Sequence, residues 1–316
     1  MKICVLGAGS LGCAMGGLLA EAGNEVWLVN RGRAHVDAMR AHGLTLCEQG
    51  VDRVVAVHAS TDCAEVAAVT GPVDLLIVLV KSFHTREAIA SARPLVGPDT
   101  VVLSLQNGLG HEDVLAEVVG RDKLLAGKTY VGGQVLEPGR VVVGHRGKDT
   151  HIGELDGSVT ERVTRVAAAF NQAGLMTEVS RNIMGKIWDK LLVNVATGAV
   201  SGITGLPYGE LYQVPEVEAT AIAAVKEAMA VAQASGVTLS TTDPRHPWVK
   251  AGAGLPYAFK ASMLQSLEKG SVTEVDYVNG AVVREGARHG VPTPVNQTLV
   301  ACIKGIERGL HPILSE

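Results

Sequence analysis

Apolar residues in the first half of the chain occur in short runs that alternate with stretches of helical periodicity. Val, Ile and Leu dominate the runs, which therefore predict strands separated by helices. Strands that are apolar throughout, with helices between them, are typical of a parallel sheet covered on both faces. The main predicted strands are Lys2–Leu6, Glu25–Val29, Val73–Val80 and Thr100–Leu105, and the first predicted helices are Leu11–Ala22 and Ala34–His42.

The pattern changes twice further along the chain. Glycines first punctuate three strand candidates, which either extend the sheet or form an antiparallel edge: Leu124–Tyr130, Arg140–Val143 and His151–Leu155. From about Asn182 onward the pattern is almost wholly helical, and Gly or Pro marks the ends of the segments. The predicted helices are Ile183–Val200, Glu216–Ser235, Tyr257–Lys269, Glu274–His289 and Pro294–Arg308.

A glycine-rich loop follows the first predicted strand and opens the first predicted helix. It has the pattern G-x-G-x-x-G and consists of Gly7, Ala8, Gly9, Ser10, Leu11 and Gly12. In this context the glycines permit a tight turn, backbone approach to a pyrophosphate and close packing of helix on strand, while the helix N-terminus attracts phosphate. We therefore predict that this loop binds a dinucleotide. The expected fold is α/β, with an N-terminal Rossmann domain over residues 1–180 followed by an all-helical domain over residues 181–316.

The end of the second predicted strand bears on which dinucleotide binds. An NAD site usually places a carboxylate there, but Val29 is followed by Asn30-Arg31-Gly32-Arg33. A guanidinium suits the 2′-phosphate of NADP. We expect NADP(H) as the cofactor and favour Arg31 over Arg33; the alternative is a pair of solvated arginines.

Polar residues follow two of the predicted strands. Lys81 ends one apolar run, and Gln106-Asn107-Gly108 ends the next. Ligands of open α/β sheets bind beyond the carboxyl ends of the strands, although a solvated lysine and an Asn-Gly turn would give the same pattern. Together these positions favour contact with cofactor or substrate.

The first helix of the second half carries a polar stripe. Lys186, Lys190, Asn194 and Gly198 recur every four residues and share one face. An ammonium can protonate an oxyanion that develops on a carbonyl after hydride attack. A solvated stripe, with Gly198 at a helix crossing, is the alternative. Glu274 also has two interpretations, because Ser-Val-Thr-Glu is a capping box in which this carboxylate would cap its own helix.

Composition narrows the class of protein. The chain has 316 residues, a formal charge of −4 and 47% apolar residues, which excludes wholesale disorder. A mildly acidic chain with 3% aromatic residues does not favour nucleic acid or an anionic membrane as a partner. Five scattered cysteines without a Cys-x-x-Cys pair indicate a reducing, cytoplasmic compartment. We expect no targeting or membrane-spanning segment and, from the dispersed histidines, no metal site.

The polar residues, taken in order, resemble the ketopantoate (2-dehydropantoate) reductase family over essentially the full length. The matching features are the glycine loop with Arg31, Lys81, Gln106-Asn107-Gly108, Trp188-x-Lys190-x-x-x-Asn194, Ser262 and the segment Thr273-Glu274-Val275-Asp276-Tyr277-Val278-Asn279-Gly280. The combination is specific, although many dehydrogenases share the glycine loop.

The resemblance implies reduction of the 2-oxo group of ketopantoate by NADPH, which gives pantoate for pantothenate and coenzyme A synthesis. It makes Lys190 the general acid and Glu274 the group that orients this lysine, the cofactor ribose and the substrate. The remaining roles are Asn107 and Lys81 near the nicotinamide and substrate, Asn194 and Ser262 on the substrate, and Arg31 on the 2′-phosphate. The expected partner is a small 2-oxo acid, and a homodimer is left open.

Three positions depart from the family pattern. Gly198, Tyr208 and Phe259 stand where the family usually has asparagine. A site that loses amides holds polar substrate groups less specifically, so we also expect a bulkier or less polar 2-oxo acid or ketone as an alternative substrate. Two further alternatives are a β-hydroxy acid dehydrogenase and a non-enzymatic NADP(H)-binding sensor. Retention of both Lys190 and Glu274 argues against the sensor.

Overall fold

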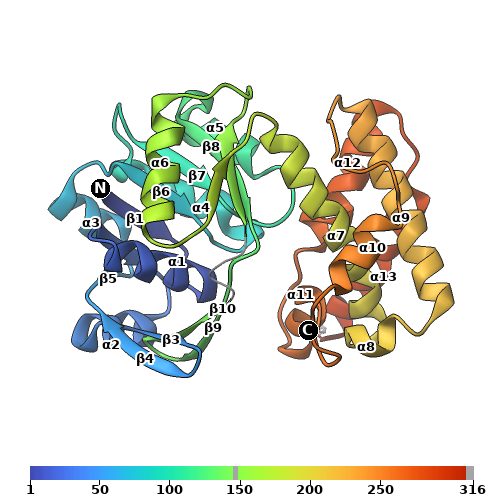
Figure 1. The fold of residues 1–316 in the computed structure, drawn as a ribbon, viewed down its shortest axis with the longest axis horizontal. Coiled ribbons are helices and arrows are strands. Elements are labelled where there is room, and N and C mark those ends of the chain that lie inside the picture. Colours follow the sequence, from blue (N-terminus) through green and yellow to red (C-terminus); the bar gives the residue numbers. More distant parts are fainter. Residues whose placement is uncertain (145–148, 311–316) are drawn as a thin grey trace, which may run out of the picture. The chain divides into compact units, whose positions relative to one another are not determined.

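The computed structural model describes residues 1–144 and 149–310 (Figure 1). They form two compact units. The first contains Met1–Gln106 and His111–Ile183, and the second contains Asn107–Gly110 together with the described residues from Met184 onward. The loop Asn107–Gly110 thus belongs to the helical unit. The predicted division at residue 180 would place this loop in the first unit instead.

The first unit is built on an eight-stranded sheet with the order β12-β11-β8-β7-β6-β1-β2-β5. All neighbouring strands are parallel except the pair β8 and β11. The chain leaves β1 toward β2 on one side and returns to β6 on the other, which is the Rossmann arrangement. The strands are β1 (Lys2–Leu6), β2 (Glu25–Val29), β5 (His58–Ser60), β6 (Leu75–Val78), β7 (Val101–Ser104), β8 (Leu124–Thr129), β11 (Thr150–Glu154) and β12 (Thr177–Val179).

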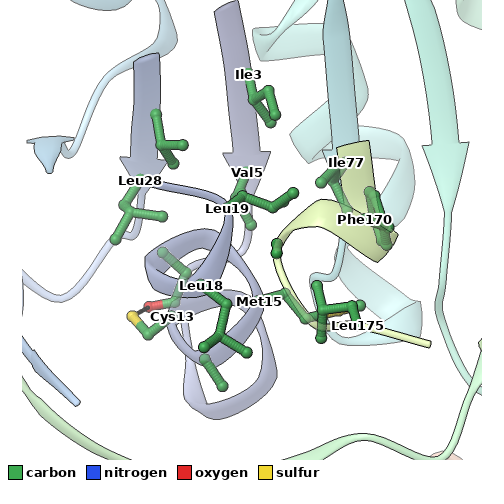
Figure 2. Packing of buried hydrophobic residues seen from close by; sticks show 14 of the residues in the cluster. Ile3, Val5, Cys13, Met15, Leu18, Leu19, Leu28, Ile77, Phe170 and Leu175 are labelled. Atoms are coloured by element: carbon green, nitrogen blue, oxygen red, sulfur yellow. Dashed lines mark hydrogen bonds between the residues drawn. The ribbon is translucent and has the colours of Figure 1, made fainter. Parts of the chain in front are cut away.

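Helices cover both faces of this sheet because successive side chains of a buried strand point to opposite faces. Ile3 and Val5 of β1 belong to one core with α1 and α6, whereas Cys4 and Leu6 belong to a second core with α3, α4 and α5. Figure 2 shows the first core, where the side chains of α1 pack against the strands and beside Phe170 of α6. The helices of this unit are α1 (Ser10–Glu21), α2 (Arg33–His42), α3 (Cys63–Thr70), α4 (Thr85–Ser91), α5 (His111–Val119) and α6 (Glu161–Gln172), with 3-10 turns η1 (Ser82–His84), η2 (Arg93–Leu95) and η3 (Arg121–Lys123).

A second, four-stranded sheet in this unit corrects part of the sequence interpretation. The predicted strands near 124–130 and 151–155 extend the main sheet as β8 and β11, but the strand near 140–143 belongs to the smaller sheet. Its order is β4-β3-β10-β9, and β10 pairs parallel with β3 and antiparallel with β9. The strands are β3 (Leu44–Glu48), β4 (Val51–Val55), β9 (Gly132–Glu137) and β10 (Arg140–Gly144).

The second unit is helical, so the predicted fold, a Rossmann domain followed by an all-helical domain, is confirmed (Figure 1). Its elements are α7 (Ile183–Thr204), α8 (Tyr208–Leu211), α9 (Pro215–Ala234), α10 (His246–Gly252), α11 (Ser262–Glu268), η4 (Val275–Tyr277), α12 (Asn279–His289) and α13 (Pro294–Leu310).

Two of the predicted helices in this unit are too long. The helix expected over 257–269 begins only at Ser262, because the carbonyls of Tyr257 and Phe259 accept hydrogen bonds from the amides at the start of α8. The helix expected over 274–289 is broken at Val278, whose backbone angles (φ −106°, ψ −93°) are not helical. The short turn η4 therefore separates Glu274 from α12.

Candidate active site

The glycine loop has the backbone shape that its sequence predicts. Gly7 has φ +98°, and a Cβ atom there would lie 2.5 Å from the Val80 nitrogen; a Cβ at Gly12 would lie 2.4 Å from the Gly7 oxygen. These two glycines are required by the turn and by close packing. A Cβ at Gly9, the N-cap of α1, would meet no atom within 4 Å. The room at Gly9 is what close approach of a pyrophosphate to the helix N-terminus requires.

A hydrogen-bonded chain ties α2 to this loop. The Gly139 N–H donates to Nδ1 of His35 at 3.1 Å, which leaves the proton of the neutral ring on Nε2. That nitrogen lies 3.2 Å from the Cys13 sulfur, and the Cys13 thiol donates to the Ala8 carbonyl at 3.2 Å. Burial raises the pKa of the Cys13 thiol to about 12 and lowers the pKa of His35. Both groups are therefore neutral links rather than reactive ones.

Arg31 lies in the turn between β2 and α2. Its side chain is 69% exposed, and its Nη1 lies 4.0 Å from Oε2 of the exposed Glu87. Arg33 is the exposed first residue of α2. Within residues 1–144 and 149–310, neither guanidinium forms a close buried ion pair, so both could bind an anion at the end of β2.

The polar residues after β6 and β7 differ in exposure and in their contacts. Lys81 is exposed and precedes η1. The Gln106 side chain donates to the Val80 carbonyl at 2.9 Å and to the Thr85 hydroxyl at 2.8 Å, so it joins the segments that follow the two strands. Gln106 therefore has a structural role in the first unit, whereas Asn107 and Gly108 of this motif belong to the second unit.

The loop that carries Asn107 is attached to the segment that carries Glu274. The Leu109 N–H donates to the Tyr277 carbonyl at 3.0 Å. Gly108 has φ +102°, and a Cβ atom there would lie 2.4 Å from the Tyr277 oxygen. Only glycine allows this approach, so the Asn-Gly pair is more than a turn former.

A cavity in the second unit brings together the three predicted substrate-binding residues, Asn107, Asn194 and Ser262, with Glu274. Its volume is about 450 Å³, including the part open to solvent. It is lined by Asn107, Asn194, Thr197, Gly198, Tyr208, Ala261, Ser262, Met263, Ser266, Glu274 and Val278. Lys190 is not among these residues in the described part of the chain; it lies half-buried on α7, one turn before Asn194 on the same helix face.

One wall of this cavity is weakly polar. The Tyr208 hydroxyl donates to the Thr197 hydroxyl at 2.9 Å, so its proton is used within the protein. The Phe259 ring packs edge-on against Tyr208, with 5.1 Å between ring centroids. A Cβ atom at Gly198 would lie 3.2 Å from the terminal methyl carbon of Met263 and 3.3 Å from its sulfur. Where the family usually has asparagine, this protein thus has the aromatic rings of Tyr208 and Phe259. At Gly198, the Met263 thioether lies beside the position in place of an amide.

The capping alternative for Glu274 is wrong. No α-helix begins there, and the Glu274 carboxylate makes no capping hydrogen bond to η4. Its side chain lines the cavity instead.

Sequence reasoning missed four residues of the lining, namely Thr197, Ala261, Met263 and Ser266. Helical spacing could have indicated two of them, because Thr197 follows Asn194 by three residues and Ser266 follows Ser262 by four. Met263 has no such signal, since an apolar residue on a helix is ordinarily part of a core.

Residues 1–144 and 149–310 make up the described part of the chain. Within these ranges no group of three or more His, Cys, Asp and Glu side chains is arranged to hold a metal ion. No helix in the same ranges combines the length and apolar character needed to cross a membrane.

Comparison with known proteins assigns the chain to a family. Residues 3–157 match the family described as ketopantoate reductase PanE/ApbA, and residues 182–307 match its C-terminal part. The 2-dehydropantoate 2-reductase of Halobacterium salinarum is 36% identical, over 98% of this chain and 99% of that protein.

Solved structures show the same likeness. A PanE/ApbA family ketopantoate reductase from Ralstonia eutropha has a TM-score of 0.88 and 37% identity, covering 98% of this chain and 99% of the other. D-mandelate dehydrogenase, solved with NADH and anilino(oxo)acetate, has a TM-score of 0.89 and 27% identity with the same coverage. The chain belongs to the ketopantoate reductase family of oxidoreductases.

Proposed function

We propose that the protein reduces a 2-oxo acid to a 2-hydroxy acid with NADPH, with 2-dehydropantoate as the substrate and Lys190 as the general acid. The observation that carries this proposal is the cavity in which Asn107, Asn194, Ser262 and Glu274 meet, with Lys190 one helical turn from Asn194. Relatives named 2-dehydropantoate 2-reductase, at 36% and 34% identity over nearly the whole chain, support the choice of substrate.

The residues of the first unit fit a nicotinamide dinucleotide. The loop Gly7–Gly12 would hold the pyrophosphate at the N-terminus of α1, where Gly9 leaves room for it. Arg31 would hold the 2′-phosphate of NADP, and no carboxylate follows β2 to bind the 2′-hydroxyl of NAD. Lys81 and Asn107 would contact the nicotinamide side, and Glu274 the ribose. The bound cofactor supplies a hydride to the carbonyl carbon.

The chain's own residues would manage the charge that the reduction creates. Negative charge develops on the 2-oxo oxygen as its carbon is reduced, and an ammonium both stabilises this charge and donates a proton. Asn194 and Ser262 provide an amide and a hydroxyl to hold the polar groups of the substrate, and Glu274 would orient Lys190.

A second candidate is a 2-oxo acid with a larger, less polar side chain. Tyr208, Phe259 and Met263 favour it, because the donor of Tyr208 is already bonded to Thr197. The likeness to D-mandelate dehydrogenase supports the same class of substrate, and its bound NADH makes NAD the alternative cofactor.

The experiment measures NADPH and NADH oxidation by the purified wild-type protein with 2-dehydropantoate, phenylglyoxylate and aliphatic 2-oxo acids. Higher kcat/KM with NADPH and 2-dehydropantoate is the result expected. A higher value with phenylglyoxylate would favour the second candidate. Cofactor binding without turnover of any of these compounds would contradict the proposed function.

A further inference from the structure

Glu274 lies on a short segment without α-helical support. Residues 271–274 have no regular structure, and η4 covers only Val275–Tyr277. Val278, which has non-helical backbone angles, then separates η4 from α12. A carboxylate on such a segment needs other contacts to keep its direction toward the cavity, because a loop holds a side chain less precisely than a helix does.

Those contacts come from one side of α13. Oε1 of Glu307 accepts hydrogen bonds of 2.7 Å from both the backbone N–H and the hydroxyl of Thr273. Nζ of Lys304 lies 2.5 Å from Oδ2 of Asp276 and 3.4 Å from Oε2 of Glu307. The residues on both sides of Glu274 are thus held by a linked pair of charges.

A third contact joins the start of α12 to α13. Nδ2 of Asn279 donates to Oδ1 of Asn296 at 3.0 Å, and both side chains are completely buried. Asn296, Lys304 and Glu307 therefore form a polar stripe on α13 that meets Asn279, Asp276 and Thr273 in turn. We call these three α13 residues the α13 clamp.

The contact between Glu307 and Thr273 is buried, which makes its loss costly. Glu307 is 8% exposed and Thr273 is 2% exposed. Without Glu307, the buried Thr273 N–H would lose its acceptor, and buried polar groups without partners are costly. The two hydrogen bonds between Thr273 and Glu307 are buried, and buried polar contacts of this kind favour a single arrangement of the segment that they hold.

We propose that Glu307 is a positioning residue, which fixes the direction of Glu274 through Thr273 and, with Lys304, through Asp276. This inference rests on the proposed function, because it assigns the clamp to the carboxylate that orients Lys190. Glu307 does not line the cavity in the described part of the chain, so its effect must pass through the segment that carries Glu274.

The test compares Glu307→Ala with Glu307→Gln and with Glu154→Ala. Glu154 is a matched control in the first unit, since it is also buried and accepts hydrogen bonds from a threonine, Thr160, and a basic residue, Arg162. We expect Glu307→Ala to lower kcat by about tenfold to about a hundredfold, the range that small misplacements of site residues cause. Glu307→Gln should recover most of kcat, and Glu154→Ala should lower only the thermal midpoint.

The decisive arm repeats the substitution in a Glu274→Gln background. If Glu307 acts through Glu274, Glu307→Ala costs nothing further there. An equal fractional loss in both backgrounds, or a kcat for Glu307→Ala equal to that of Glu154→Ala, would overturn the proposal while leaving the reaction itself intact. If Glu307→Ala does not fold, Thr273→Val serves in both backgrounds, because it removes the hydroxyl that bonds Glu307. Failure of the proposed function would show instead as an inactive wild type, which would overturn both.

Discussion

The Asn30 side chain joins the end of β2 to the glycine loop: its Nδ2 donates to the Ala8 carbonyl at 2.6 Å, and its Oδ1 accepts from the Gly32 N–H at 2.7 Å. Both ends of the amide are used, so Asn30 fixes the turn in which Arg31 lies. Asn30 stands where an NAD site usually has an acidic residue, and it acts as a brace; the proposed function assigns the 2′-phosphate to the neighbouring Arg31.

The first prediction concerns cofactor choice. Arg31→Ala should lower kcat/KM for NADPH by about tenfold to a hundredfold, since a hydrogen bond to a charged group contributes about 1.5–3 kcal/mol. The value for NADH should not change, because NADH has no 2′-phosphate. Steady-state kinetics with both cofactors measure the effect, with Arg33→Ala as the matched control. Equal losses with NADPH and NADH, or a larger effect at Arg33, would contradict the assignment.

The second prediction concerns the weakly polar wall of the cavity. Gly198→Asn should raise the ratio of kcat/KM for 2-dehydropantoate over phenylglyoxylate by about twofold to tenfold, as expected for one added hydrogen bond of about 0.5–1.5 kcal/mol. The added side chain meets the flexible end of Met263, which can move aside.

Gly198→Ala is the control for that experiment, because it adds the Cβ atom without the amide. Its substrate ratio should equal that of the wild type. If alanine and asparagine change the ratio alike, the shape of this wall and not its polarity determines the preference.

The third prediction concerns pH and the link between α2 and the glycine loop. Burial lowers the pKa of His35 below its ordinary value of 6.5, and its Nδ1 already accepts the Gly139 N–H. The unfolded chain therefore binds a proton at His35 more readily than the folded one, so the free energy of unfolding should fall as the pH drops below 6.5.

Urea unfolding at pH 7.5 and 5.5 tests this prediction. His35→Gln should lose less stability between these two pH values than the wild type does. His42→Gln, which changes an exposed histidine at the end of the same helix, should behave as the wild type. A wild-type pH dependence in His35→Gln would contradict the prediction, because it would show that groups other than His35 cause the loss of stability.

Local patterns in the sequence predict much of this fold. The glycine loop, β1, β2 and α7 follow from apolar runs, turn chemistry and helical spacing, all of which act over a few residues. The strand near 140–143 was harder to place, because its partner β3 lies about ninety residues earlier and no local signal records that pairing. The short start of α11 has a similar cause, since the carbonyls of residues 257 and 259 are bonded to α8.

The candidate site shows the same division. Lys190 and Asn194 are visible as a helical stripe, and Asn107 as part of an Asn-Gly pair. That Asn107 and Glu274 share one cavity depends on the Leu109–Tyr277 hydrogen bond, which joins positions far apart in the chain. The clamp residues on α13 were not singled out either, because Lys and Glu on a helix ordinarily indicate a solvated face.

The most direct test asks whether Lys190 acts as the general acid. NADPH oxidation with the preferred 2-oxo acid is measured for Lys190→Ala and for Lys186→Ala, a control one turn earlier on the same face of α7. We predict that Lys190→Ala lowers kcat by about a hundredfold to ten-thousandfold, the usual contribution of a positioned proton donor, with NADPH affinity unchanged. Lys186→Ala should keep the wild-type kcat. A Lys190→Ala enzyme that retains kcat within a few-fold of the wild type would contradict the account.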